Sequence, residues 1–107
     1  MGAKISFQHM SNAQLQVHIR RVAQDSGRVF FLDHALHRMQ ERVVNDIEVL
    51  MCLREGVIQR PAKVDRSTGE VRATMEHFGS ARNLSVVVAL DDQDPDVLVV
   101  TVMTRVR

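Results

Sequence analysis

His34, Arg38 and Arg42 are the residues of this chain whose types and spacing best suit chemistry on a phosphate. They stand at i, i+4 and i+8, so on a helix of about 100° per residue they form one stripe. An imidazole can carry a proton near neutral pH, and a guanidinium can donate two parallel hydrogen bonds to phosphate oxygens. The same side chains also suit a solvated helix surface, so a phosphate site and a wet helix face are both open interpretations.

Metal-independent cleavage of RNA would use this stripe in a defined way. Cleavage needs a base for the ribose 2′-hydroxyl, an acid for the leaving oxygen, and cations for the crowded phosphate. The positive end of the helix and the neighbouring Arg38 favour a neutral His34, which can accept a proton. Arg38 and Arg42 would then hold the phosphate.

Residues of the predicted strands extend this candidate site. Thr101 and Arg105 lie on one side of the last predicted strand, and they would complete a pocket if that face of the sheet meets the helix. Arg72 and Arg105 are expected as further phosphate ligands. Arg72 and His77 fall on opposite faces of a regular strand, so both could serve only across a bulge. Thr101 also fits plain β-propensity.

Other chemistries find little support. His34 and His37 have a spacing that could bind a metal, but no third ligand follows at a suitable spacing, so neither a metal nor another cofactor is expected. Cys52 is the only cysteine, which excludes an internal disulfide, and its apolar surroundings indicate a buried structural thiol. The chain contains no glycine-rich phosphate loop and no Ser-His-Asp pattern.

The stripe needs a helix to carry it, and residues 33–43 have the required apolar spacing. Asp33 is of a type that caps helices, and a short buried strand is predicted before it at 29–32. Residues 1–10 show little pattern and are expected either as a short strand or as a poorly ordered start.

Two further helices are predicted, one on each side of this helix. Ser11 and Gln14 have the spacing of a capping box, ahead of an apolar stripe that Gly27 would end in the left-handed conformation. Asn45 is expected to cap a third helix, which closes at Gly56. That helix is apolar nearly all round, which predicts that it is largely buried.

Four strands are predicted after the third helix, at 57–64, 71–78, 84–90 and 97–106. Pro61 confines the first of them to a sheet edge or a bulge, whereas the last two are apolar enough to be central. Because short turns join antiparallel neighbours, we expect an α+β domain. Its N-terminal helices would pack on a four-stranded antiparallel sheet, or a five-stranded one if 29–32 joins.

Length, composition and charge fit one domain spanning 1–107. The 107 residues are 45% apolar, which is enough for one modest core. Residues 1–63 carry nine Lys and Arg against six Asp and Glu, and residues 64–107 carry five against seven, so the basic excess lies in the half with the stripe. Aromatic residues make up only 4%, which argues against a platform on which bases stack.

The start of the chain is too polar for a signal peptide, and no apolar run approaches membrane-spanning length. A cytoplasmic protein without membrane contact is therefore expected.

Five residues form a motif, His34-Ala35-x-x-Arg38-Met39-x-x-Arg42, ahead of a helix that ends at Glu55-Gly56 and of two apolar strands. This arrangement resembles a family of small bacterial domains of unknown function that open with HAxxRMxxR. That family is similar to the RelE/BrnT-like toxins of a wider ribonuclease superfamily, whose core has helices followed by an antiparallel sheet. The resemblance covers roughly residues 30–105 and leaves the role of 1–28 open. After Arg42, where relatives tend to have glycine, this chain has Val43.

The resemblance implies a toxin-like RNA-binding domain and, in its finer form, a metal-independent endoribonuclease. Catalytic roles would fall to His34, as base or acid, with Arg38, Arg42 and Thr101 beside it. RNA and a cognate antitoxin-like protein are the implied partners. The alternative is a non-enzymatic protein-interaction module, which the near-neutral net charge of +1 and the absence of tyrosine favour. A third interpretation makes Arg38 and Arg42 structural, tying their helix to the end of the sheet.

Overall fold

Three α-helices, two short 3-10 helices and five strands make up the part of the chain that the structure describes. The computed structural model describes the backbone of residues 6–79 and 82–106, with side chains as far as Thr101. In chain order the elements are η1 (Phe7–His9), α1 (Asn12–Val22), η2 (Ser26–Arg28), β1 (Val29–Phe31), α2 (Asp33–Glu41), α3 (Asp46–Glu55), β2 (Lys63–Val64), β3 (Val71–Phe78), β4 (Asn83–Asp91) and β5 (Asp94–Val106).

The five strands form one sheet in the order β1-β5-β4-β3-β2. The strands from β2 to β5 pair antiparallel with their neighbours in sequence, whereas β1 pairs parallel with β5. The predicted α+β class is confirmed, and so are the central positions of β4 and β5. The parallel edge corrects the expectation of a wholly antiparallel sheet. Two helices separate β1 from the later strands, so no tight turn dictates its direction.

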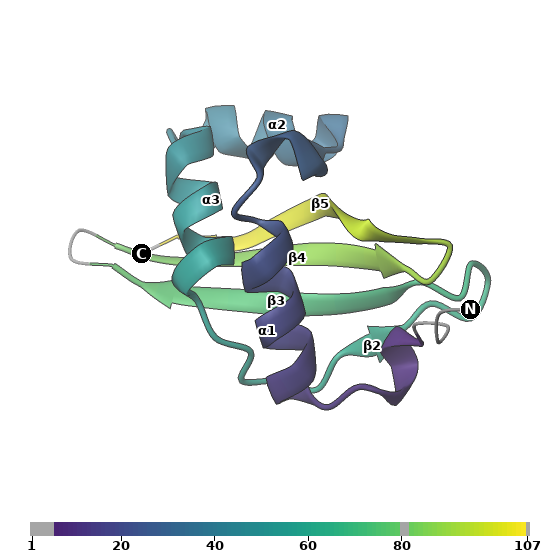
Figure 1. Cartoon of the computed structure of the whole chain (residues 1–107). Helices are drawn as coiled ribbons and strands as arrows, with labels where there is room; N and C mark the ends of the chain where they lie inside the picture. Colours follow the sequence, from purple (N-terminus) through teal and green to yellow (C-terminus); the bar gives the residue numbers. More distant parts are fainter. Residues whose placement is uncertain (1–5, 80–81, 107) are drawn as a thin grey trace.

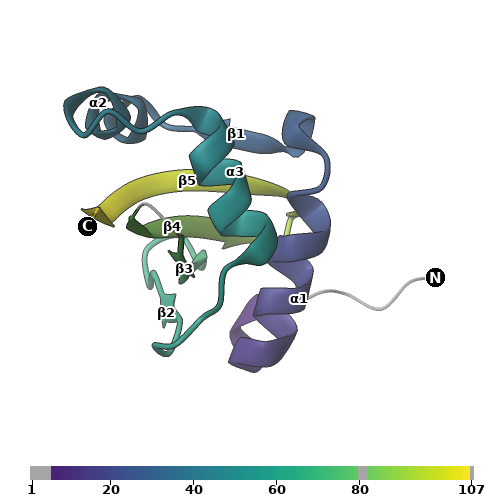
Figure 2. The ribbon, with the colours of Figure 1, turned by 90° about the vertical axis from the view of Figure 1, so that its left-hand side faces the viewer.

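The helices form two groups around this sheet. α1 and α3 cover one face, while α2 lies at the edge formed by β1 and β5 (Figures 1 and 2). The opposite face carries none of the described helices, and we call it the helix-free face. Consequently α2 is close to β5 and lies apart from the layer that α1 and α3 form.

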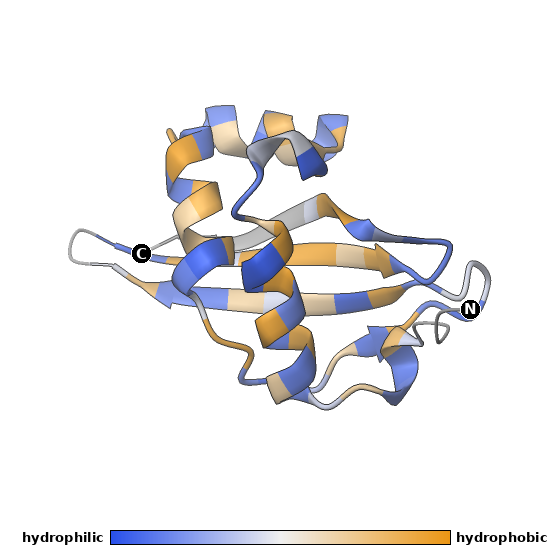
Figure 3. Cartoon of the chain, in the orientation of Figure 1, coloured by the Kyte–Doolittle hydropathy of each residue, from blue (hydrophilic) through white to orange (hydrophobic). Residues whose placement is uncertain are grey.

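The core lies between the sheet and the layer of α1 and α3. β4 is hydrophobic along most of its length, whereas β3 alternates (Figure 3). This matches a central strand buried on both faces beside a strand with one wet face. The largest fully buried side chains include Phe7, Leu15, Ile19, Leu53, Met75, Leu90 and Leu98.

The start of the described chain belongs to this core. Phe7 is 0% exposed, and its backbone N–H donates to the Asp92 carboxylate at 2.9 Å. Residues 6–10 therefore form neither a strand nor a poorly ordered start, because the short 3-10 helix η1 places Phe7 in the core. Residues 1–5 lie outside the described residues.

Helix ends follow the sequence at two places and depart from it at a third. The predicted capping box begins α1 at Ser11, and the predicted N-cap Asn45 begins α3, where it forms a capping box with Glu48. Asp33 is wrong as the N-cap of α2, because Leu32 holds that position without a side-chain cap. The N–H of Leu32 still donates to the carbonyl of Val100 at 3.1 Å, so the β1–β5 ladder keeps Leu32 extended. The helix then begins at Asp33, one residue earlier than an N-cap at Asp33 would allow.

The two glycines at helix ends do not act as left-handed terminators. Gly27 has no positive φ and lies in η2, five residues beyond Val22, the last residue of α1. Gly56 has φ −75°, and a Cβ there would lie 2.4 Å from the carbonyl oxygen of Cys52. Glycine is needed at 56 for this close approach rather than for its backbone conformation.

Two arginines tie α1 and α3 together at their C-terminal ends. Arg20 of α1 donates to the carbonyl of Gly56 at 2.7 and 2.9 Å, and Arg54 of α3 donates to the carbonyl of Ala23 at 2.7 Å. Each helix thus supplies the cation that satisfies the last carbonyls of the other.

β2 is much shorter than the strand predicted at 57–64. Val57 forms an isolated antiparallel bridge with Glu76, and pairing resumes only at Lys63, opposite Arg72. Pro61 lies in the interruption, where its missing N–H removes a donor from the ladder. The predicted sheet edge is therefore confirmed, with a gap in it.

Candidate functional site

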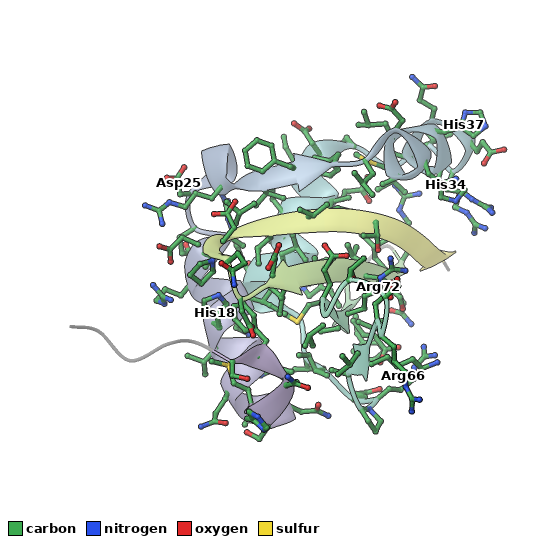
Figure 4. The ribbon with its side chains drawn as sticks, turned by 90° about the vertical axis from the view of Figure 1, so that its right-hand side faces the viewer. His18, Asp25, His34, His37, Arg66 and Arg72 are labelled. Carbon is green, nitrogen blue, oxygen red and sulfur yellow. The ribbon has the colours of Figure 1, made fainter. Side chains whose placement is uncertain are left out.

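α2 carries His34 and Arg38 along one flank, and Arg42 follows as the residue that ends the helix. The helix buries Ala35 and Met39, which are 0% and 6% exposed. His34 is exposed, whereas Arg38 and Arg42 are half-buried. His34 lies on the side of the molecule away from α1, as does Arg72 of β3 (Figure 4). His34 therefore faces the same side as the helix-free face.

The charges of the stripe are weakly paired. The Arg38 Nε lies 4.0 Å from Glu41 Oε1, and the other oxygen of Glu41 lies 3.6 Å from His37 Nε2. All three side chains are at least 40% exposed, and exposed pairs of this kind contribute about 0–1 kcal/mol. In the described part of the chain, the side chains of His34 and Arg42 form no hydrogen bond or ion pair.

α2 ends in a Schellman motif built on a valine. The N–H of Val44 donates to the carbonyl of Met39 at 2.9 Å, and that of Val43 to Gln40 at 3.3 Å. Val43 has φ 53°, in the left-handed region that favours glycine.

Arg82, which sequence reasoning did not select, fixes this corner. Its guanidinium donates to the carbonyl of Val43 at 2.8 Å and to both oxygens of Glu48 at 2.6 and 2.8 Å. These hydrogen bonds lower the pKa of Glu48 and raise that of Arg82. Glu48 was visible as an acid in the first turn of α3, but nothing local marked Arg82, because it comes from the β3–β4 connection.

Thr101 lies where β5 bulges. Val100 faces Val88 and Val102 faces Val87, so Thr101 is the extra residue between two pairs. Its hydroxyl donates to the carbonyl of Val87 at 3.2 Å, and the residue is 6% exposed. Thr101 therefore presents little surface to a ligand.

The remaining predicted residues lie on β3 and β5. Arg72 is exposed, and its Nη2 lies 3.6 Å from Asp65 Oδ2. His77 lies on the other face of β3, because the register between β3 and β4 is regular from Val71 to Phe78 and no bulge intervenes. The backbone of Arg105 pairs opposite Ser85, and its side chain lies outside the described residues.

The buried titratable groups lie away from the stripe. The ring of His18 has Nε2 2.7 Å from the carbonyl of Pro95 and Nδ1 3.2 Å from Arg21 Nη2. A carbonyl only accepts and a guanidinium only donates, so these contacts require the neutral ring with hydrogen on Nε2. Burial lowers the pKa of His18 and raises the pKa of the Cys52 thiol to about 12. Cys52 is fully buried, which confirms the predicted structural thiol.

An apolar ridge runs from α2 to α3, on the flank of α2 opposite His34 and Arg38. Four of its side chains are between 39% and 81% exposed: Leu36, Val43, Ile47 and Met51. Pockets of about 500 Å³ and 230 Å³ open along it, the first beside Leu36 and Val43, the second beside Ile47 and Met51. The prediction that α3 is largely buried is thus wrong for one side of that helix.

No helix among the described residues is long and apolar enough to cross a membrane. Among the same residues, no group of three or more His, Cys, Asp or Glu side chains is arranged to hold a metal ion.

Comparison with known families gives one match. A family model described as a domain of unknown function (DUF4258) matches residues 31–104, from the end of β1 to near the end of β5. The resemblance to a family of domains of unknown function is thereby confirmed, while the comparisons provide no link to RelE/BrnT-like toxins. No curated protein and no solved structure matches the chain.

Proposed function

The chain belongs to the DUF4258 family, and from the stripe on α2 we propose that it is a toxin-like RNA-binding domain of the cytoplasm. The observation that carries the proposal is the flank of α2 on which the exposed His34 and the half-buried Arg38 and Arg42 lie without a strong partner among the described residues. Two guanidinium groups and an imidazole along one helix flank suit successive phosphates of an RNA backbone.

The weak pairing of Arg38 supports this role. A contact of 4.0 Å to an exposed carboxylate contributes little, so a phosphate can take the place of Glu41 at small cost. Arginine suits the task better than lysine, because its planar fork donates two parallel hydrogen bonds to one phosphate.

The finer form of the proposal is metal-independent RNA cleavage. His34 would accept the proton of a ribose 2′-hydroxyl while that oxygen attacks phosphorus, and the bond from phosphorus to the 5′-oxygen would break. The leaving 5′-oxygen would take its proton from solvent, and Arg38 and Arg42 would stabilise the extra charge on the phosphate.

RNA binding is tested by fluorescence anisotropy with a labelled single-stranded RNA of twenty nucleotides. The double variant Arg38→Ala/Arg42→Ala is expected to raise Kd about tenfold or more and to reduce the salt dependence of binding by about two phosphate contacts. Arg28→Ala/Arg66→Ala is the matched control, since it also removes two arginine charges, from exposed positions outside α2. Equal affinity of the double variant and the wild type would refute RNA binding by the stripe.

Cleavage is tested on the same RNA by gel, with wild-type protein beside His34→Ala. Products from the wild type alone would support the catalytic form. If both proteins cleave equally, or neither cleaves, His34 is not a catalytic residue and the proposal reduces to RNA binding.

A second candidate function is protein interaction, and the apolar ridge on α2 and α3 favours it. Contiguous exposed apolar side chains mark interfaces more often than singly scattered ones. Its occupant would be a cognate antitoxin-like protein. Ile47→Asp should abolish capture of a co-expressed partner after crosslinking and ribonuclease treatment, and Val17→Asp, at 65% exposure against 66% for Ile47, should not. Capture that survives Ile47→Asp would exclude the ridge.

A further inference from the structure

β2 and β3 place two cations directly opposite one another. Lys63 faces Arg72 in the antiparallel register, and both side chains are exposed. Like charges directly opposite in a sheet destabilise the pairing of the strands. The fold thus retains an unfavourable contact at a two-residue edge strand, where a polar or acidic side chain would pair better.

Neighbouring acids neutralise this pair only in part. The Nη2 of Arg72 lies 3.6 Å from Asp65 Oδ2. The other oxygen of Asp65 already accepts from the N–H and hydroxyl of Ser67 at 2.9 and 2.7 Å, and these hydrogen bonds lower the pKa of Asp65. Lys63 forms no ion pair with any residue that the structure describes. Positive charge therefore remains between the two strands.

A hollow of about 280 Å³ opens beside these cations on the helix-free face. It is lined by Arg60, Pro61, Lys63, Arg72, Thr74 and Val87. Three of these six residues are basic and none is acidic. The hollow follows from the gap in the sheet edge. Between the pair Val57–Glu76 and the pair Lys63–Arg72, the edge segment advances by six residues while β3 advances by only four. The excess chain, with Pro61 in it, bows away from β3.

We propose that this space, the Lys63–Arg72 hollow, binds a phosphate group. Phosphate oxygens would accept from the fork of Arg72 and from the ammonium of Lys63, and the anion would neutralise the like-charge pair. Thr74 adds a hydroxyl, and Pro61 and Val87 add apolar walls that suit a ribose or base beside the phosphate. The ligand class is a nucleotide phosphate, either free or within an RNA strand.

This site is separate from the stripe. β2 and β3 lie at the opposite edge of the sheet from β1, beside which α2 lies. Phosphate binding in the Lys63–Arg72 hollow is therefore independent of the function proposed for α2.

The test measures Tm and calorimetric binding with three probes: inorganic phosphate, uridine 5′-monophosphate, and an eight-residue oligouridylate. Ionic strength is kept constant with chloride, and the oligouridylate is titrated into Arg38→Ala/Arg42→Ala protein so that the stripe cannot contribute. The proposal expects a rise in Tm of roughly 5 °C at a probe concentration ten times Kd.

Lys63→Glu is the decisive variant, because it turns the like-charge pair into an opposite-charge pair. The Tm of Lys63→Glu without a probe should rise, while its calorimetric affinity for each binding probe should fall at least tenfold. Arg66→Glu is the matched control. It makes the same charge change on the exposed turn between β2 and β3, near Arg72 but outside the hollow (Figure 4).

The outcomes separate the sources of the phosphate. A response to inorganic phosphate or the mononucleotide that Lys63→Glu removes supports a free ligand, and a response to the oligouridylate alone supports a site for an RNA strand. No response to any probe, a response retained in Lys63→Glu, or an equal loss in Arg66→Glu would overturn the proposal.

Discussion

Val43 is a single residue held in a backbone conformation that its own side chain disfavours. The left-handed region costs a residue with a Cβ about 1–2 kcal/mol, and φ 53° places Val43 in it. The strain is tolerated because three hydrogen bonds meet at this corner: the two of the Schellman motif, and the one from Arg82 to the carbonyl of Val43. Val43 is 81% exposed, so the packing of its side chain contributes little stability to offset the strain.

Val43→Gly is expected to stabilise the protein by about 1 kcal/mol. Removing the Cβ relieves the strain, and the greater freedom of glycine in the unfolded chain offsets part of that gain. Urea unfolding measures the difference, with Val43→Ala as the control that keeps a Cβ. A glycine variant no more stable than the alanine variant would contradict the argument.

His18 is the residue whose titration couples most directly to folding. Its two hydrogen bonds require the neutral ring, and the Phe7 ring packs edge-on against it with centroids 4.9 Å apart. Burial lowers its pKa, the nearby Arg21 lowers it further, and the Pro95 hydrogen bond and Asp96 act in the other direction.

The pKa shift of His18 fixes the sign of a pH effect. The unfolded chain takes up a proton near the ordinary pKa of 6.5, before the folded protein does, so the free energy of unfolding rises with pH in that window. The contribution is complete above pH 6.5 and is lost as the pH falls through the lower pKa of the folded state. His18→Gln can keep both hydrogen bonds without titrating. Its free energy of unfolding should therefore fall less than that of the wild type between about pH 7 and pH 5. Parallel pH profiles of the two proteins would contradict this.

At the scale of elements, one arginine joins two segments far apart in the sequence. Arg82 follows β3 and donates both to the carbonyls of Arg42 and Val43 at the end of α2 and to the capping carboxylate of Glu48 in α3. We therefore expect this contact to stabilise the corner between α2 and α3.

Arg82→Ala is expected to lower Tm more than Arg66→Ala, which removes an exposed arginine without a described ion pair. Arg82→Lys should recover only part of the loss, because an ammonium has no planar fork for Glu48 and the Val43 carbonyl. Circular-dichroism melts of the three variants provide the comparison. Equal melting temperatures for all three would show that the corner holds without Arg82.

At the scale of the whole molecule, the folding unit is larger than the family match. The match begins at residue 31, yet Phe7, Leu15 and Ile19 are at most 1% exposed in the same core as β4 and β5. The arginine contacts between α1 and α3 add polar links across the same boundary. The hydrophobic core is therefore built from side chains of residues 6–28 together with those of residues 31–104.

Phe7→Ala is expected to destabilise the protein by about 3–5 kcal/mol, the usual loss for a buried aromatic ring. Phe78→Ala, at 58% exposure, should change the free energy of unfolding by no more than about 0.5 kcal/mol. Urea unfolding of both variants measures this. A small effect of Phe7→Ala would mean that the N-terminal segment is not part of the cooperative unit.

Local rules in the sequence predicted much of this protein. The capping box at Ser11, the N-cap at Asn45 and the apolar run at 84–90 depend on residues within a few positions of one another, so the sequence alone was sufficient for them. The spacing of His34 and Arg38 on one helix flank is local in the same sense. The family motif is local too, and its match was foreseeable from the residues around the stripe.

Tertiary structure decided what depends on distant segments. The hydrogen bond from the N–H of Leu32 to the carbonyl of Val100 makes Leu32 the N-cap, so that α2 begins at Asp33. A bulge buried Thr101, and a loop arginine, Arg82, closed the corner that Val43 strains. The opposition of Lys63 and Arg72 exists only in the β2–β3 register. Periodicity shows which side of an element is apolar, but pairing partners, edges and gaps arise only when segments separated by tens of residues meet.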